Sequence, residues 1–178
     1  MFYIRPAVMS EKDTLEALIK RSGIGLADGF YDAQQAAAVT AEVFGVDSAL
    51  VLDGTYFAIE EAGRIVACGG WSKRATDFGG DHAKSGNDRP LDPATEAARI
   101  RAFFVDPAMA RRGLGMLLLE HCTRAAKEAG FRALELVSTM PGEPLYLRYG
   151  FRPLERLELS LAGGTVKVPL TRMRKEIS

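Results

Sequence analysis

Short apolar runs and amphipathic segments alternate along this chain, and the two patterns predict strands and helices. Extended segments are expected at residues 2–7, 56–60, 65–71, 100–105, 133–137, 154–161 and 165–173. Apolar residues at helical spacing predict helices that follow Ser10 and that cover residues 34–44, 116–128 and 144–148. The expected order of elements is therefore β-α-α-β-β-β-α-β-α-β-β.

Polar residues and glycines mark the boundaries of these elements. Ser10 is expected to cap the first helix, and Gly23 and Gly25 are expected to break it into a flexible loop. Residues 61–64 join two apolar runs at the spacing of a β-hairpin. The polar stretch 76–93 predicts a long surface loop.

The helix expected at 116–128 carries an apolar stripe, so it should pack flat on a sheet. The stripe consists of Leu114, Leu117, Leu118, His121, Cys122, Ala125 and Ala129. Cys122, and Cys68 in a predicted strand, are interpreted as buried core residues and not as members of a disulfide frame or metal cluster.

Composition and charge indicate one ordinary soluble domain that spans residues 1–178. Of the residues, 47% are hydrophobic and 26% are charged. Lys plus Arg and Asp plus Glu both total 23, so the overall charge predicts neither a nucleic-acid nor a membrane partner. The first residues have no signal-peptide pattern and no stretch approaches a membrane span, which predicts a cytoplasmic protein.

A basic glycine loop lies between the strand that ends at Val105 and the amphipathic helix. Asp106-Pro107 stops the strand, and Arg111-Arg112-Gly113-Leu114-Gly115 leads into the helix. A helix start offers free N–H groups to an anion, glycines allow close approach of the backbone, and arginines add charge. The loop therefore predicts a pyrophosphate site, with a basic surface turn as the alternative. It lacks the Lys and Ser or Thr of a Walker loop and the third glycine of a dinucleotide fingerprint.

A second motif lies downstream, in Leu145-Tyr146-Leu147-Arg148-Tyr149-Gly150-Phe151. With the strand end Val105-Asp106-Pro107 and the pair Gly113-Leu114-Gly115, it resembles the signature of the GNAT superfamily of acyl-CoA-dependent N-acyltransferases. Ala110 departs from the Gln or Arg usual three residues before the first glycine. The resemblance covers nearly the whole chain and implies the GNAT fold. That fold is of the α/β (α+β) class, with a central mixed, mostly antiparallel twisted sheet flanked by helices.

The resemblance implies that an amine attacks the thioester of an acyl-CoA, most often acetyl-CoA, in a ternary complex and without a metal. The main chain of Phe103, Phe104 and Val105 would pair with the pantetheine amides. The residues expected to hold the phosphates are Arg111, Arg112, Gly113, Leu114, Gly115 and Met116. The acceptor would be a primary amine of a small molecule or peptide, and the protein a monomer or homodimer.

Tyr146 matches the family tyrosine that lies beside the thioester sulfur. A phenol with an ordinary pKa of about 10 is protonated at neutral pH and can protonate a departing thiolate. The alternative is that Tyr146 is a packing residue. We assign a packing role to Tyr149, three residues on.

No residue is assigned as general base. Many family members have a Glu on the central strand where this chain has Arg99, and Glu96 has the opposite strand parity. The two histidines, His82 in the polar loop and His121 on an apolar helix face, are interpreted as structural.

Arg99 and Arg101 share one face of the predicted central strand. They are expected to hold a carboxylate or phosphate of the acceptor, and the alternative is that they form ion pairs with nearby Asp or Glu. In this family the loop at residues 23–31 lines the acceptor side, so Phe30 and Tyr31 are further expected contacts, together with Trp71.

The sequence therefore predicts an N-acetyltransferase that uses acetyl-CoA. One alternative is a catalytically silent acyl-CoA-binding or regulatory domain that keeps the phosphate loop. Another is a nucleotide-dependent enzyme, for which the sequence offers no second motif.

Overall fold

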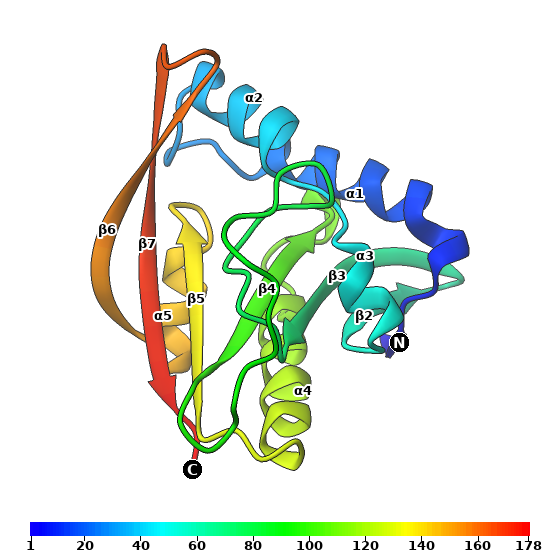
Figure 1. The fold of residues 1–178 in the computed structure, drawn as a ribbon. Helices are drawn as coiled ribbons and strands as arrows, with labels where there is room; N and C mark the ends of the chain where they lie inside the picture. The colour runs from blue at the N-terminus through cyan, green and yellow to red at the C-terminus, as the bar shows by residue number, and fades with distance from the viewer.

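The computed structural model describes residues 1–178 and contains a seven-stranded sheet of order β1-β2-β3-β4-β5-β7-β6 (Figure 1). The strands are β1 (Tyr3–Pro6), β2 (Tyr56–Glu61), β3 (Arg64–Ser72), β4 (Ala98–Val105), β5 (Ala133–Thr139), β6 (Arg152–Leu161) and β7 (Val166–Glu176). The helices are α1 (Lys12–Gly25), α2 (Ala33–Glu42), α3 (Ser48–Leu52), α4 (Leu114–Glu128) and α5 (Glu143–Tyr149). Short 3-10 helices cover Met9–Glu11 and Pro107–Met109.

The sheet is mixed and mostly antiparallel. Only β4 and β5 are parallel, and every other neighbouring pair is antiparallel. A parallel pair needs a crossover connection, which α4 supplies here. The predicted fold class is confirmed, and the order of elements agrees with the predicted one except for the additional short helix α3.

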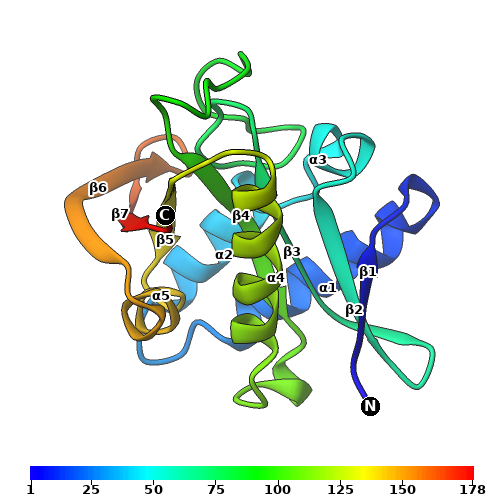
Figure 2. The ribbon, with the colours of Figure 1, turned by 90° about the horizontal axis from the view of Figure 1, so that it is seen from below.

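Helices cover both faces of the sheet. On one face, Leu118 and Cys122 of α4 and Tyr146 of α5 belong to one buried cluster. On the other face, residues of α1 such as Leu15 pack on β2, β3 and β4, and residues of α2 such as Val39 pack on β7. Figure 2 shows α4 in front of the sheet and α1 and α2 behind it.

The first helix continues through two glycines that the sequence predicts as breaks. A Cβ atom at Gly23 would lie 2.4 Å from Thr40 Oγ1 of α2, and one at Gly25 would lie 2.5 Å from Pro107 Cγ. These glycines therefore allow α1 to approach its neighbours closely. The predicted cap at Ser10 is also corrected, because this residue lies inside the 3-10 helix that precedes α1.

The buried stripe of α4 is rotated relative to the predicted one. Its buried residues are Leu114, Leu118, Leu119, Cys122, Thr123 and Ala126, whereas Ala129 is exposed. His121 is half-buried, with its ring edge-on to Phe57 at 4.4 Å between centroids. Both cysteines are free and buried, as predicted.

Residues 76–93 contain no helix or extended strand, as predicted, but they do not lie on the surface throughout. Thr76 and Leu91 are buried, and Leu91 belongs to the main core cluster. The guanidinium of Arg101 on β4 donates hydrogen bonds to the carbonyls of Thr76 and Gly79, so the loop lies against this strand. No helix in the chain is long and apolar enough to span a membrane.

β4 and β5 separate after two paired positions. The parallel register joins only Ala98 and Arg99 to β5, and the rest of β5 pairs with β7 alone. A bulge accompanies the separation, because the register of β4 with β3 shifts and Ala102 adopts a φ of 55°. The C-terminal half of β4 therefore has no partner strand on its β5 side.

Candidate active site

A cavity of about 240 Å³ lies between the diverging halves of β4 and β5. Residues 100–105 line one side and residues 136–139 the other. Gly115 and Tyr146 reach the cavity from the α4–α5 face, and Val39 reaches it from the α1–α2 face. Both helical layers therefore border one cavity.

The free edge of β4 offers main-chain groups to this cavity. No strand pairs with this edge beyond Arg99, although the Val105 N–H already donates to Ser22 Oγ at 3.2 Å, which leaves the Val105 carbonyl and the main chain of the residues before it. Gly69 on β3 makes room for the Phe103 ring, since a Cβ atom at this glycine would lie 2.4 Å from Phe103 Cδ1. An unpaired strand edge can bind an extended, amide-containing ligand by strand addition.

The N-terminus of α4 borders the cavity through Gly115, which is the only one of the predicted phosphate-binding residues 111–116 in its lining. Its N-cap, Gly113, has a φ of 81° and no side chain caps the first turn. Arg111 is also left-handed, with a φ of 63°. The first-turn N–H groups lack intrahelical partners, so they favour an anion. Gly115 allows α4 to pack closely against α5, because a Cβ atom at this position would lie 2.7 Å from Leu145 Cδ2 of α5.

The two loop arginines differ in what they contact. Arg112 forms an ion pair with Glu61 at 3.5 Å and lies 5.0 Å from the centroid of the Phe2 ring. Arg111 is exposed and has no ion-pair partner within the chain. Of the remaining predicted phosphate-binding residues, Leu114 is buried in the core and only its main chain can meet a ligand, while Met116 is half-buried.

Tyr146 is held by aromatic packing and lines the cavity. Its ring centroid lies 6.2 Å from that of Phe103 and 5.8 Å from that of Phe151. Its hydroxyl makes no hydrogen bond within the chain. Burial raises the pKa of Tyr146, with a smaller contribution from the Cys122 thiol, so the hydroxyl remains a donor at neutral pH.

Tyr149 has the packing position that the sequence predicts. Its hydroxyl donates to Thr123 Oγ1 at 3.0 Å, and the Lys175 ammonium lies 5.4 Å from its ring centroid. It does not line the cavity. The two tyrosines of the motif thus have separate environments although only three residues separate them.

Of the three predicted aromatic acceptor contacts, only Tyr31 lines the cavity. Its hydroxyl donates to the Pro169 carbonyl at 2.6 Å and accepts from the Met140 N–H at 3.0 Å. Burial raises its pKa to about 12. Phe30 is 48% exposed and lies outside the cavity. Trp71 is buried on the α4 face beside Phe131, which gives it no access to the cavity.

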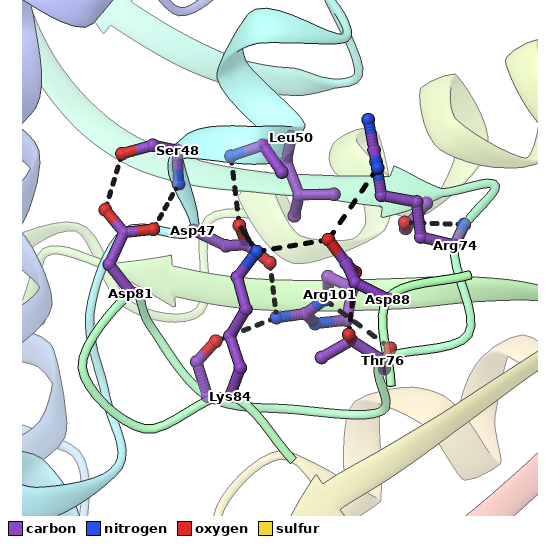
Figure 3. Close-up of polar contacts among 12 residues, drawn as sticks. Asp47, Ser48, Leu50, Arg74, Thr76, Asp81, Lys84, Asp88 and Arg101 are labelled. Atoms are coloured by element: carbon purple, nitrogen blue, oxygen red, sulfur yellow. Dashed lines mark hydrogen bonds and ion pairs between the residues drawn. The ribbon is translucent and has the colours of Figure 1, made fainter. Parts of the chain in front are cut away.

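Arg101 is buried and belongs to an ionic network under residues 76–93 (Figure 3). Its guanidinium contacts Asp47 at 3.1 Å. Lys84 approaches the same Asp47 at 2.8 Å and Asp88 at 3.3 Å, and Asp88 also accepts from Thr76 Oγ1. The position of this arginine therefore depends on carboxylates of its own chain.

Arg99 lies on the same face of β4 as Arg101, as predicted, and is also paired. It contacts Asp77 at 2.9 Å and Glu135 at 3.3 Å, and Asp77 contacts Arg172 at 3.2 Å. Both predicted anion-binding arginines are therefore engaged in ion pairs, which is the alternative that the sequence left open. The geometry gives no support for a free pair of guanidinium groups that recognises the acceptor.

No free general base lies at the cavity. Glu96 is paired with Arg89, whose hydrogen bonds hold the pKa of Glu96 at about 2. Neither histidine lines the cavity, and burial lowers the pKa of His121. Asp77 is the only carboxylate in the lining. No group of three or more His, Cys, Asp and Glu side chains is arranged to hold a metal ion.

Several lining residues have no local sequence signal. Asp77 and Phe78 come from the long loop, Phe44 follows α2 and Ser22 lies in α1. They meet only because both helices and the loop pack on the same face of the sheet. The polar composition of residues 76–93 predicts the loop but not its contact with β4.

Comparisons with known proteins agree with this geometry. A sequence model of the acetyltransferase (GNAT) family matches residues 27–151. A comparison with curated protein sequences gives no match.

Several solved structures are similar in fold. A GCN5-related N-acetyltransferase from Rhodopseudomonas palustris has a TM-score of 0.72 at 16% identity, and the match covers 98% of this chain and 94% of that one. The ribosomal-protein-S18-alanine N-acetyltransferase from Escherichia coli has a TM-score of 0.61 at 17% identity, covering 100% and 95%. A putative acetyltransferase from Salmonella typhimurium, solved with its cofactor acetyl-CoA, has a TM-score of 0.65 at 16% identity, covering 99% and 94%.

Proposed function

The chain belongs to the GNAT family of acetyltransferases, and from that premise we propose that it transfers an acetyl group from acetyl-CoA to a primary amine within a ternary complex. The observation that carries the proposal is one cavity that joins an unpaired β4 edge, the uncapped start of α4 and the free hydroxyl of Tyr146. These are the three features that an acyl-CoA requires for its amides, its phosphates and its leaving sulfur.

In this proposal the cofactor enters from the α4–α5 face. The main chain at Phe103, Phe104 and Val105 pairs with the pantetheine amides by strand addition. The N–H groups of residues 113–116 hold the pyrophosphate, and Arg111 adds a cation that no carboxylate of the chain neutralises. Arg112 contributes less, because Glu61 already pairs with it.

The reaction needs no net proton from solvent. The neutral amine attacks the thioester carbonyl, the C–S bond breaks, and the nitrogen of the adduct must lose one proton while the thiolate gains one. The Tyr146 hydroxyl donates its proton to the sulfur and recovers one from the nitrogen, directly or through water. Because burial raises the pKa of this phenol, it is protonated at the start of each cycle.

A second candidate is an acyl-CoA-binding domain without turnover. The paired state of Asp77, the only carboxylate at the cavity, favours it, because no free base is available to an ammonium substrate. Turnover separates the two candidates, since both require the cofactor site.

The experiment combines calorimetric titration of acetyl-CoA with a thiol-release assay over primary amines. Acetyl-CoA at a hundredfold excess over its Kd should stabilise the fold by about 2.7 kcal/mol, because it binds only the native state. Thiol release that requires an amine supports the enzyme. Binding without thiol release for every amine supports the silent domain, and no binding at millimolar acetyl-CoA contradicts both.

A further inference from the structure

We infer that the acceptor is an apolar monoamine, an aryl-alkyl or alkyl amine without a carboxylate and without a second cationic group. The inference rests on the proposed function and adds the class of acceptor to it. The inference is based on the composition and charge of one cavity wall. This wall lies on the α1–α2 face of the sheet, opposite the start of α4.

The two faces of the cavity are chemically different. The helix start that we propose to hold the phosphates lies on the α4–α5 face. The opposite wall is formed by the end of α1, α2 with the segments that flank it, and residues 77–80. A cofactor anchored at α4 leaves this opposite wall for the acceptor.

That opposite wall is predominantly apolar and aromatic. Its side chains include Leu26, Tyr31, Val39, Val43, Phe44 and Phe78. Phe44 packs edge-on against Phe104 of β4 at 5.0 Å between centroids, which fixes one ring beside the reacting strand. The hydroxyl of Tyr31 is satisfied by main-chain partners, so Tyr31 presents its ring to the cavity rather than a free polar group.

The only charged side chains in the lining are Asp77 and Arg101, and each forms an ion pair within the chain. Of their polar atoms, only the buried Nε of Arg101 has no hydrogen-bond partner. Each carboxylate oxygen of Asp77 accepts from an arginine, Oδ1 from Arg99 and Oδ2 from Arg172. Arg101 has a side chain that is 1% exposed and a buried counter-charge on Asp47 (Figure 3). A carboxylate or a second ammonium on the acceptor would lose water and would meet no charge that is not already paired within the chain, which is unfavourable.

The same wall assists the chemistry that the mechanism requires. An apolar environment disfavours the charged form of an amine and so lowers its pKa. A monoamine that enters this cavity is thereby shifted toward the neutral, nucleophilic form. The absence of a free carboxylate base at the cavity is consistent with this route.

The test uses two matched pairs of amines and measures kcat/KM by thiol release. Phenethylamine and phenylalanine differ by one carboxylate, and hexylamine and 1,6-diaminohexane differ by one ammonium. We expect kcat/KM to be at least tenfold higher for phenethylamine than for phenylalanine, and at least tenfold higher for hexylamine than for 1,6-diaminohexane. Equal values, or preference for the charged member in either pair, overturn the inference. Preference for phenylalanine would assign acceptor recognition to the arginines of β4.

Substitutions at Phe78 test whether this wall binds the acceptor. Phe78→Ala should raise KM for phenethylamine at least fivefold and leave the Kd for acetyl-CoA unchanged, whereas Phe78→Leu should retain most of the affinity. Leu154→Ala, an exposed apolar position on β6, is the matched control and should change neither value. A Phe78→Ala enzyme with unchanged KM would contradict this wall as the acceptor site.

The outcomes distinguish this inference from the proposed function. Turnover of charged amines alone contradicts the acceptor class and leaves the acetyltransferase activity established. Acetyl-CoA binding without turnover of any of the four amines contradicts the acceptor class, and extension of that result to a broad panel contradicts the enzyme as well.

Discussion

The hydroxyl of Tyr56 on β2 donates a hydrogen bond of 2.7 Å to the carbonyl of Ala102 on β4. Tyr56 is fully buried, and Ala102 is the residue with a φ of 55° in the β4 bulge. The hydrogen bond therefore holds a strained backbone conformation at the point where β4 loses its β5 partner. The cavity depends on this separation, so we regard Tyr56 as a positioning residue for the β4 edge that we propose as the cofactor-binding edge.

Tyr56→Phe should destabilise the protein by about 0.5–1.5 kcal/mol, because it removes a partly buried hydrogen bond to the Ala102 carbonyl. Urea unfolding followed by circular dichroism measures the change. Acetyl-CoA affinity should fall as well, and Tyr3→Phe at an exposed position is the control. Unchanged stability and affinity in Tyr56→Phe would show that the bulge does not need this hydrogen bond.

Gly113→Val should abolish most acetyl-CoA binding while the fold persists. A Cβ atom at Gly113 meets nothing within 4 Å, so the substitution introduces no clash within the chain. The φ of 81° still opposes a β-branched residue, at a cost of about 1–2 kcal/mol. Calorimetry on the folded variant gives the affinity.

Alanine substitutions of the two loop arginines compare their contributions to acetyl-CoA affinity. Arg111→Ala should weaken acetyl-CoA binding more than Arg112→Ala, because Arg112 is already paired with Glu61. If Gly113→Val binds acetyl-CoA with unchanged affinity, the loop is only a structural turn.

Asp47→Asn should destabilise the protein by about 3–5 kcal/mol, because it leaves the buried Arg101 without its counter-charge. The substitution keeps the size of the side chain and its capacity to cap α3. Chemical denaturation measures the loss. Lys12→Ala, which removes an exposed ion pair with Asp81, should cost only about 0.2–1 kcal/mol. Similar losses in the two variants would argue against the network as the support of residues 76–93.

The pH dependence of turnover should follow the acceptor amine. Burial raises the pKa of Tyr146 above its ordinary value of 10.0, so this donor stays protonated as the pH rises through neutrality and no alkaline loss of activity is expected below that value. With no free base at the cavity, kcat/KM should rise with pH until the amine is neutral and then remain level. Phenethylamine and the less basic benzylamine provide the comparison. An inflection at one fixed pH for both amines would instead indicate a titrating group of the protein.

The features that sequence reasoning identified are local. The loop at 111–115 and the motif around Tyr146 each reside in one contiguous segment, and the alternation in β4 correctly puts Arg99 and Arg101 on one face. The partners of these arginines could not be predicted in the same way. Asp47 lies 54 positions before Arg101, and their contact depends on how the start of α3 packs against β4.

The glycines also show that local roles can be predicted from the sequence and long-range contacts cannot. The sequence correctly singles out Gly113, whose left-handed backbone begins a helix. Gly23 has no such local role, and its small size matters only because α2 lies against it. Trp71 is a related case, since strand alternation does not reveal which face of the sheet holds the cavity.

The most direct test of the proposed mechanism is the single-turnover rate of Tyr146→Phe beside that of Tyr149→Phe, each with its Kd for acetyl-CoA. The first change removes only the hydroxyl at the cavity, and the second removes only a hydroxyl that contacts Thr123. We expect a rate about 10²–10⁴-fold lower for Tyr146→Phe with an unchanged Kd, and a nearly normal rate for Tyr149→Phe. Equal rates in the two variants, or a loss in Tyr146→Phe that lies entirely in the Kd, would contradict the proposed mechanism.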